Sequence, residues 1–351
     1  MLIPVVLLSA SCSTGGSGTT PSRSPSSASS SSDGSTSVAT TGRPATYFID
    51  CAAAGGGTGT WERPWTSPAE LREVFLEPGS TVSFKRGCSW EGQVWITGRG
   101  TAAQPITVSA HGDGTAPRLR DSDAAGNDAV VTVAAPYTVL SNLHVSGGTS
   151  HGVHLQGAHG LVKDVEIERT GFGVRFTGQG STASNVTVHD LRMFRNTEGG
   201  DDDAGAVGFV VEADDVTVER SSCTNCRAES HDYGHDGGFI EIWQRGDRLK
   251  ILNNRGTNTQ GFLEAGAQDG TGSATDVVIR GNVMTECHGG AVNLHTGDKF
   301  AITARNVLLE RNTFDVTAGG TMFSGNTDAL ILRNNTLRIG GKPYQPSPNP
   351  G

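Results

Sequence analysis

The sequence predicts an all-β solenoid, in which short parallel strands stack coil upon coil. The 351 residues include 49 glycines but are only 35% hydrophobic. This composition favours many short strands with tight turns over a helical bundle. Similar short segments also recur every 22 to 33 residues, which is the spacing of solenoid repeats. Together these observations predict one domain over residues 47–340.

Each repeat has an aliphatic residue followed by a polar anchor near a turn. An inward asparagine at such a turn can bond the backbone of its own and neighbouring coils and so form a ladder. We therefore expect a structural role for these side chains rather than a ligand-binding one. The polar anchors are Asn142, Asp164, Ser221, Asn254, Asn282, Asn312 and Asn335.

The two ends of the chain are predicted to lie outside the folded domain. Residues 1–12 resemble a bacterial lipoprotein signal, with an apolar run too short to span a membrane and Cys12 as the lipidated residue. Residues 13–46 are rich in Ser, Thr, Gly and Pro, which is typical of a disordered tether. Residues 341–351 are predicted to be a flexible tail. We expect a cell-surface lipoprotein or a secreted protein.

The domain is predicted to begin with a strand at 47–51 and a short capping helix. Ser67 is the expected N-cap, Pro68 takes the first helical position, and Glu70 completes a capping box. The helix is expected to carry Leu71, Val74 and Phe75 on one face and to end at Pro78. Such a helix suits a lid over the open end of a solenoid, where backbone and core would otherwise be exposed.

The cysteines fit an oxidising compartment. Cys51 and Cys88 are expected to pair within the N-terminal segment. Cys223 and Cys226 form either a local disulfide or two buried thiols. A zinc site would need a second close pair, and Cys287 stands alone.

Three glycine-led segments are predicted to form one wall of the solenoid: 238–243, 261–266 and 290–295. Alternation along each strand directs the aliphatic residues to the core. It directs Glu241, Glu264, Asn293 and His295 outward, at equivalent positions on successive coils. Two acidic excursions, 198–205 and 229–238, precede or adjoin this wall, and long loops beside a regular scaffold often carry function.

Residues 78–93 and 105–117 resemble the N-terminal part of right-handed parallel β-helix proteins of the pectate-lyase-like superfamily. The resemblance implies that fold over residues 47–339. It also implies a polysaccharide lyase, a glycoside hydrolase or an epimerase, and in the lyases Ca²⁺ together with a Lys or Arg base. The motifs of the polygalacturonase-type hydrolases are only faintly echoed, which disfavours that family.

The outward side chains of the wall supply acids, bases and metal ligands. Carboxylates stacked about 4.8 Å apart repel each other, so one holds a proton or both share a cation. A retaining glycosidase needs such a pair about 5 to 5.5 Å apart, and the same oxygens suit Ca²⁺. Candidate catalytic residues are Glu241, Glu264, His235, Arg175 and His295. Candidate Ca²⁺ ligands are Glu241, Glu264, Asn293, Asp201, Asp202 and Asp203.

Substrate contacts are expected from Trp243, Asn293, His154 and Tyr233. The indole of Trp243 can stack on a sugar ring, and Arg175 can bind a uronate carboxylate bidentately. Structural roles remain open for the same residues: Trp243 can shield the core beneath a loop, and Arg175 can be a solvated side chain. The histidines of 229–238 can equally occupy a hydrogen-bonded turn.

The predicted function is cleavage of an extracellular polysaccharide by a monomer. A lyase of an acidic polysaccharide is slightly favoured on the fold alone, with Ca²⁺ as a cofactor and His235 or Arg175 as the base. A glycoside hydrolase using Glu241 and Glu264 is the alternative. A glycan-binding solenoid and a structural spacer are further alternatives. The net charge of −9 without a basic stripe excludes nucleic acid as an expected partner, and contact with a membrane is expected only through the lipid anchor.

Overall fold

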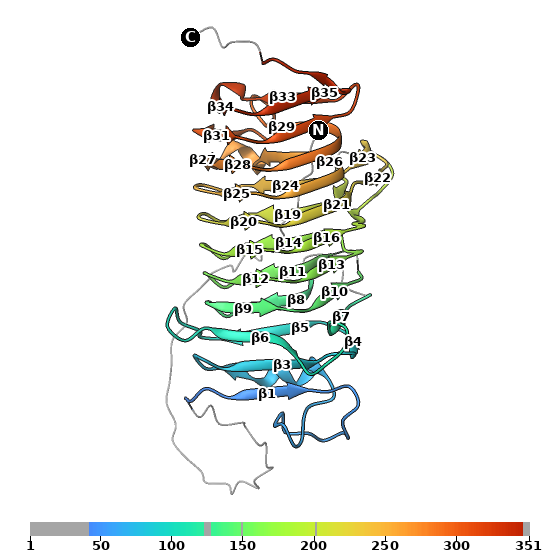
Figure 1. The fold of residues 1–351 in the computed structure, drawn as a ribbon, viewed down its shortest axis with the longest axis vertical. Helices are drawn as coiled ribbons and strands as arrows, with labels where there is room; N and C mark the ends of the chain where they lie inside the picture. Colours follow the sequence, from blue (N-terminus) through green and yellow to red (C-terminus); the bar gives the residue numbers. More distant parts are fainter. Residues whose placement is uncertain (1–41, 123–127, 149, 201, 347–351) are drawn as a thin grey trace, which may run out of the picture.

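The computed structural model describes residues 42–122, 128–148, 150–200 and 202–346. Its strands stack as successive parallel coils along one axis, from the N-terminal coil to the C-terminal coil (Figure 1). The predicted right-handed parallel β-helix is confirmed. The predicted signal at 1–12, including Cys12, and the tether up to residue 41 lie outside the described residues, as do the last five residues of the predicted tail.

The first face of the solenoid is one parallel sheet that runs the length of the molecule. Its strands are short because each coil turns away after three to six residues. In order they are β1 (Thr46–Ile49), β3 (Thr81–Lys85), β6 (Ile106–His111), β9 (Thr138–Ser141), β12 (Leu161–Lys163), β15 (Thr182–Ser184), β20 (Thr217–Glu219), β25 (Lys250–Leu252), β28 (Val278–Arg280), β31 (Val307–Glu310) and β34 (Leu330–Arg333).

On most coils, a turn residue in the left-handed conformation, such as Asp164 or Asn253, separates the strand of the first face from the strand of the second face. Its last strand also pairs with the antiparallel strand β36 (Lys342–Pro343). In order its strands are β4 (Ser89–Glu91), β7 (Arg118–Arg120), β10 (His144–Ser146), β13 (Glu166–Glu168), β16 (Thr187–His189), β21 (Ser222–Cys226), β26 (Arg255–Gly266), β29 (Val283–Leu294), β32 (Thr313–Val316) and β35 (Thr336–Ile339).

The third face carries the predicted wall. The long strands β26 and β29 bend across the corner and belong to both the second and the third face, with a register shift between Thr259 and Gly261. The other strands of this face are β2 (Phe75–Leu76), β5 (Val94–Gly98), β8 (Ala129–Val133), β11 (His151–Leu155), β14 (Phe172–Phe176), β19 (Val207–Val211), β24 (Gly238–Trp243) and β33 (Thr321–Gly325).

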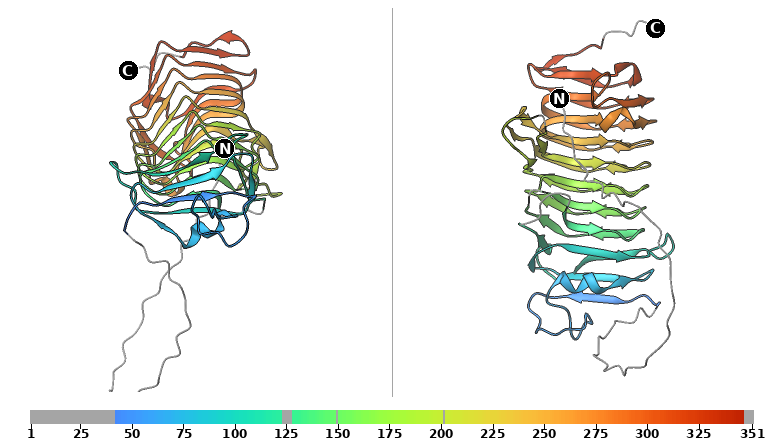
Figure 2. Two further views of the ribbon diagram at one scale, coloured as in Figure 1. Left: turned by 60° about the horizontal axis from the view of Figure 1, so that its bottom comes forward. Right: turned by 180° about the vertical axis from the view of Figure 1, so that it is seen from behind.

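Excursions leave the coils at a few corners. The antiparallel pair β22 (Ala228–Ser230) and β23 (Gly234–Asp236) projects from the side of the stack (Figures 1 and 2). The antiparallel pair β17 (Met193–Arg195) and β18 (Ala204–Gly205) precedes it by one coil. The remaining elements are the parallel strands β27 (Gly272–Thr275) and β30 (Ile302–Arg305) and the short 3-10 helices η2 (Gln268–Gly270) and η3 (Thr327–Ala329).

The predicted capping helix is present as the 3-10 helix η1 (Pro68–Glu73). Ser67 caps it, and its hydroxyl accepts a hydrogen bond from the Ala69 amide at 3.1 Å. The helix ends earlier than predicted, because Phe75 and Leu76 pair as a strand with β5 and Phe75 is 47% exposed. The role of this helix as a lid stays a prediction.

The asparagine ladder is confirmed in the later coils. Asn282 donates to the Ile251 carbonyl at 2.9 Å and to Asn312 Oδ1 at 2.9 Å, and its own Oδ1 accepts from Asn254 at 2.9 and 3.0 Å. In the early coils the prediction is wrong by one position. Asn142 and Asp164 occupy the left-handed turn, with φ of 57° and 54°, and the inward position next to them is apolar.

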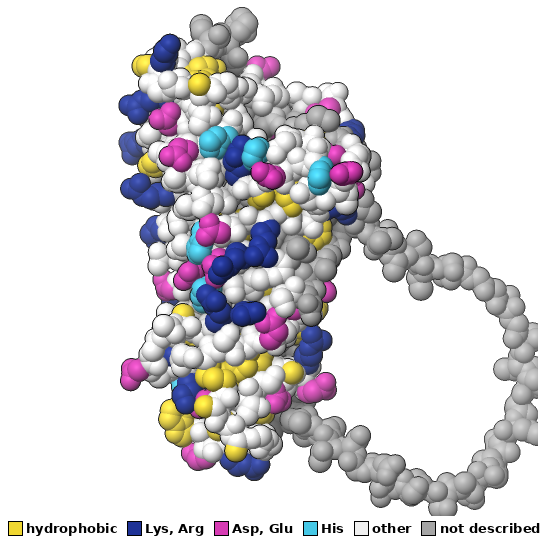
Figure 3. Space-filling view, turned by 90° about the vertical axis from the view of Figure 1, so that its right-hand side faces the viewer, with side chains coloured by type: hydrophobic (Ala, Val, Ile, Leu, Met, Phe, Trp, Pro, Cys, Tyr) yellow, Lys and Arg dark blue, Asp and Glu magenta, His cyan; other side chains and the backbone are white. Residues whose placement is uncertain are grey.

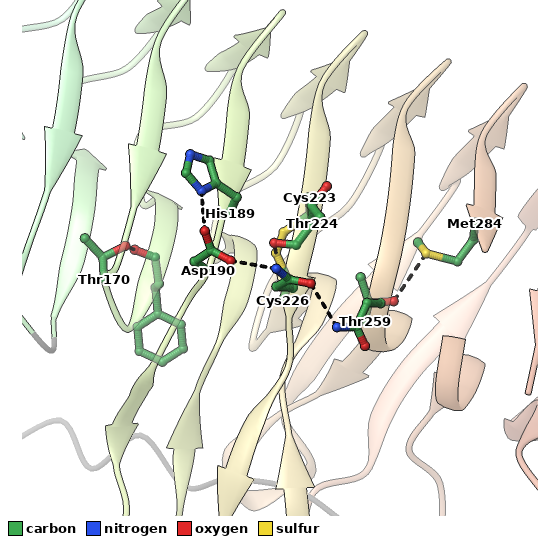
Figure 4. The surroundings of a disulfide bond; sticks show 11 residues. Thr170, His189, Asp190, Cys223, Thr224, Cys226, Thr259 and Met284 are labelled. Atoms are coloured by element: carbon green, nitrogen blue, oxygen red, sulfur yellow. Dashed lines mark hydrogen bonds and ion pairs between the residues drawn. A yellow bond between two sulfur atoms is a disulfide. The ribbon is translucent and has the colours of Figure 1, made fainter. Parts of the chain in front are cut away.

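The structure decides between the alternatives that the sequence left open for the cysteines. Cys51 and Cys88 are bonded, and so are Cys223 and Cys226, which lie beneath the corner of the second face (Figure 4). Cys287 is a buried free thiol. Within the described ranges, no helix is long and apolar enough to cross a membrane.

Candidate functional site

The predicted vertical row of polar side chains exists on the third face. Glu241 of β24 pairs in register with Glu264 of β26, and Glu264 pairs with Asn293 of β29. The row continues to Ser324 of β33, whose hydroxyl donates to Asn293 Oδ1 at 3.0 Å. The sequence alternation therefore placed these side chains on one face correctly.

The expectation that both glutamates face solvent is wrong for Glu241, which is only 5% exposed. Its register partner in the coil before is Val210. Val210 belongs to a small apolar cluster outside the solenoid, with Phe172, Val207 and Tyr233. Burial, and then the charges of Glu264 and Asp236, raise the pKa of Glu241 well above its usual value. Glu241 is thus a covered side chain with a raised pKa, and it is not among the residues that line the cleft described below.

The hairpin β22–β23 is fastened to the preceding excursion by a reciprocal pair of aspartates. Asp203 is fully buried, and its carboxylate accepts hydrogen bonds from the Thr197 amide at 2.8 Å, the Ser230 hydroxyl at 2.7 Å and the Asp232 amide at 3.0 Å. Asp232 in turn accepts from the Asp203 amide at 3.2 Å. The two acidic loops of the sequence therefore hold each other in place beside the wall.

This hairpin delivers Asp236, one of the polar residues of the acidic excursion 229–238. Asp236 is 7% exposed. Its Oδ1 accepts from the Gly237 amide at 2.7 Å, while Oδ2 has no hydrogen-bond partner in the part of the chain that the structure describes. Burial, reinforced by the charge of Glu264, raises the pKa of Asp236 to about 8. The sequence indicates that this glycine-flanked polar segment could supply an acid or a base beside the wall, but it does not single out Asp236 among its members.

Glu264 is held by a network on the opposite side. Asn293 donates to Glu264 Oε1 at 2.8 Å, and His295 Nε2 lies 3.3 Å from the same oxygen. His295 Nδ1 lies 2.7 Å from Asp298 Oδ2. Burial lowers the pKa of His295, but its bonds to the two carboxylates outweigh burial and raise the pKa above its usual value. His295 thus bridges the carboxyl groups of Glu264 and Asp298, and together with Asn293 it fixes the orientation of Glu264.

Asp236, Glu264 and Asn293 line one cleft of about 440 Å³. Its floor is made by the glycines at 261 and 290, which pair in register. In the preceding coils, Phe172 and Val207 occupy the equivalent positions in the column, and their side chains belong to the apolar cluster that fills this space. A Cβ at Gly290 would meet nothing closer than the Thr321 carbonyl at 3.7 Å. Glycine thus leaves space here that a side chain fills elsewhere.

Three other predicted site residues lie away from this cleft. Arg175 is 4% exposed and forms a bidentate ion pair with Glu212, at 2.8 Å for the shortest contact. His154 is 7% exposed and bonds Thr177 at 3.0 Å. Trp243 is 1% exposed beneath Phe300. None of these side chains is available to a sugar. His235 and Tyr233, by contrast, line the cleft.

The residues predicted to bind Ca²⁺ do not form one site. Glu264 and Asn293 bond each other on the wall, whereas Asp202, Asp203 and Asp232 cluster in the two loops. The Asp203 and Asp232 carboxylates are occupied by amide donors, as described above. Asp201 lies outside the described residues. The set does not fit a single Ca²⁺ ion.

The stacked parallel coils, with a cleft on the third face, define a right-handed parallel β-helix. The family model "Right handed beta helix region" matches residues 126–337, more than half of the chain, and the protein belongs to this family. No curated protein matches its sequence.

Solved structures share the fold at low sequence identity. Pectate lyase Pel9A has a TM-score of 0.54 and 13% identity, with 83% of this chain and 79% of that one covered. The alginate lyase of Paenibacillus sp. str. FPU-7 has a TM-score of 0.50 and 17% identity, with 84% and 99% covered. The chain spans 66% of a GH136 lacto-N-biosidase from Eubacterium ramulus, with 84% of this chain covered, 14% identity and a TM-score of 0.43. At these identities the likeness establishes the fold alone.

Proposed function

We propose that the protein is a glycoside hydrolase that cleaves a polysaccharide in the cleft between the hairpin β22–β23 and the wall. Asp236 is the general acid, and Glu264 is its partner carboxylate. One observation carries the proposal: two carboxyl groups line the same cleft in different environments. Asp236 is buried with a raised pKa, and Glu264 has a side chain that is 27% exposed and bonded by Asn293 and His295. In glycosidases a carboxyl group with a raised pKa acts as the general acid, and a second carboxyl group flanks the same bond.

In the proposed reaction the proton on Asp236 passes to the glycosidic oxygen as the bond from that oxygen to the anomeric carbon breaks. Glu264 stabilises the positive charge that develops on the sugar, either by attacking the anomeric carbon or by taking a proton from an attacking water. His295 and Asn293 orient Glu264 through the shared Oε1 contacts. The pair Glu241 and Glu264 of the sequence analysis is thus replaced by Asp236 and Glu264.

A polysaccharide lyase is the second candidate. It is favoured by His235, whose imidazole lines the cleft and could abstract a proton. Against it, no Lys or Arg among the described lining residues stands ready to neutralise a uronate carboxylate at the reacting sugar. Two solved structures with this fold are named pectate lyase and alginate lyase, so the lyase needs a direct test.

The location outside the cytoplasm and the monomeric state are also proposals. The two disulfides support an oxidising compartment, and the Ser/Thr-rich N-terminal segment supports a tether. Cell fractionation of the full chain, with and without Cys12→Ser, tests the anchor. Size-exclusion chromatography with light scattering tests the monomer.

The reaction is tested by digesting a panel of neutral and acidic polysaccharides, with and without EDTA. New reducing ends without the ultraviolet absorbance of unsaturated uronates support the hydrolase, and rising absorbance supports the lyase. Loss of activity in EDTA would indicate a metal requirement. Asp236→Asn and Glu264→Gln should each abolish hydrolysis, whereas Asp315→Asn, a carboxyl on β32 outside the cleft, should not. Full activity in both site variants would refute the assignment.

A further inference from the structure

The N-terminal end of the solenoid carries the most exposed large aromatic side chain among the described residues. Trp61 is 64% exposed, whereas the nearby Trp65 and Trp90 are buried. The Trp61 ring contacts Phe48 and His111, whose ring centroids lie 5.0 Å and 5.7 Å away. These contacts leave most of the indole uncovered, so it does not serve mainly to cover the core. The lower, N-terminal part of the face in Figure 3 shows several uncovered hydrophobic side chains.

The loop that presents Trp61 is held in place at its base. The Gly59 amide donates to the Arg63 carbonyl at 3.0 Å and closes a tight turn around Trp61. The Gly59 carbonyl accepts from the Phe48 amide at 2.8 Å, which ties the turn to β1. The Cys51–Cys88 disulfide fixes the start of the loop. An aromatic ring on a loop that is already ordered loses little conformational freedom when it binds a ligand.

Trp61 lines a hollow of about 360 Å³ together with a run of three glycines, residues 55–57. A Cβ at Gly55 or Gly56 would meet nothing within 4 Å, so the peptide groups of this run are open. Among the described residues, the amides of 55–57 have no hydrogen-bond acceptor. The Arg63 guanidinium donates to the Gly56 carbonyl at 2.7 Å and holds the run in position. The hollow therefore combines an aromatic face with unused peptide donors.

The charged groups around the hollow balance one another. Asp50 is paired with Lys85, whose Nζ lies 2.6 Å from Oδ2, and Glu62 and Arg63 add one charge of each sign. Burial lowers the pKa of His111, so the imidazole beside the indole adds no positive charge near neutral pH. An uncharged ligand is complementary to such a site. A sugar ring fits it, because the ring offers an apolar C–H face to the indole and hydroxyl groups to the polar wall.

The hollow lies far from the cleft. It adjoins β1, whereas the cleft lies beside the coil of β25, and these two strands are seven positions apart in the first sheet (Figure 1). At the usual spacing of neighbouring strands this separation is on the order of 34 Å. A sugar unit in the hollow therefore cannot contact Asp236 or Glu264, and the hollow is a separate site.

We propose that Trp61 and the glycine run 55–57 form a second glycan-binding site, which takes an uncharged sugar unit of a polysaccharide. The indole stacks against the sugar ring, and the amides of the run donate to its hydroxyl groups. A polymer held both here and in the cleft is bound at two points, which raises its local concentration at the cleft. This last consequence rests on the proposed function, whereas binding in the hollow does not.

The test measures retention of the folded, full-length protein in native gels that contain hydroxyethyl cellulose, soluble xylan, galactomannan or polygalacturonate. Every protein in the gels carries Asp236→Asn, so that the polymer stays intact. Trp61→Ala and Trp61→Phe are compared with Phe75→Ala in this background. Phe75 is the matched control, because it is an exposed aromatic on β2 and does not line the hollow. Circular dichroism and thermal melting confirm that each variant is folded.

We expect retention by at least one of the three uncharged polymers. Retention should weaken roughly 10- to 100-fold in Trp61→Ala, which is the usual effect of removing an aromatic anchor, partly recover in Trp61→Phe, and persist in Phe75→Ala. Equal retention of Trp61→Ala and its parent, an equal loss in Phe75→Ala, retention by polygalacturonate alone, or no retention would overturn the site. Cleavage is measured separately with Asp236 restored, and its absence would refute the hydrolase while leaving this site intact.

Discussion

Asp203→Asn should loosen the hairpin that carries the proposed acid while leaving the solenoid intact. The carboxylate accepts three hydrogen bonds within the two excursions and is fully buried. Asparagine has the same shape, but it turns one acceptor oxygen into a donor that faces another donor. Losing one charged hydrogen bond costs about 1.5 to 3 kcal/mol. The hairpin should therefore open roughly 10- to 150-fold more often.

Hydrogen exchange read by mass spectrometry measures this opening directly. Amides in residues 228–236 should exchange faster by about that factor, with little change in the core strands, because local opening does not require global unfolding. Hydrolysis should lose kcat more than KM, since Asp236 is displaced from the bond while the wall is unchanged. Asp202→Asn is the matched control, because its side chain is 38% exposed and its ion pair with Arg195 lies at the surface. Wild-type exchange rates in Asp203→Asn would refute the reasoning.

Three further predictions concern the proposed acid Asp236, the glycine floor of the cleft and the asparagine ladder of the solenoid. The pKa of Asp236 is raised to about 8 from the value of about 3.9 usual for an aspartate, so its contribution to stability is fully present below about pH 3.9 and is lost as pH rises toward 8. Urea unfolding should show the wild type losing stability relative to Asp236→Asn over that window, by at most about 1.4 kcal/mol per pH unit, and a pH-independent difference would contradict the burial argument. Gly290→Val should fill the cleft and reduce hydrolysis on the order of 10- to 100-fold with an unchanged melting temperature; unchanged kinetics would place the substrate elsewhere. Asn282→Ala should cost about 2 to 4 kcal/mol in denaturant unfolding because it breaks the buried ladder, whereas Gln179→Ala, which removes one exposed side-chain bond to Asp215, should cost under about 1 kcal/mol; equal costs would argue against a structural role for the ladder.

The features of the fold that depend on the repeat spacing and on the alternation of side chains along a strand could be predicted from the sequence. The repeat spacing and the two-residue alternation placed Glu241, Glu264 and Asn293 in one column, because a parallel stack transmits register from coil to coil. The same logic predicted the asparagine ladder in the later coils. It failed by one residue at Asn142 and Asp164, because an asparagine or aspartate is equally suited to the left-handed turn beside the inward position.

The sequence could not predict what covers the wall. Alternation tells which side of a strand a residue occupies, but an outward residue is buried when an excursion packs over it. Glu241 and Arg175 are outward by alternation, yet both are buried. For the same reason the sequence could not single out Asp236 among the polar residues of 229–238, because contacts between Asp203 and the hairpin hold that residue beside the wall. No local pattern encodes such contacts.

The proposed acid reaches the wall on a hairpin and not on a coil. The hairpin joins the stack covalently at Arg227 and Gly237, and the Asp203 carboxylate of the other excursion fastens it by accepting hydrogen bonds from Ser230 and Asp232. The proposed acid therefore belongs to an insertion between β21 and β24, and not to the stacked strands that form the coils. Grafting a different insert at the same corner, together with its fastening loop, should alter which bonds the molecule breaks without disturbing how it assembles.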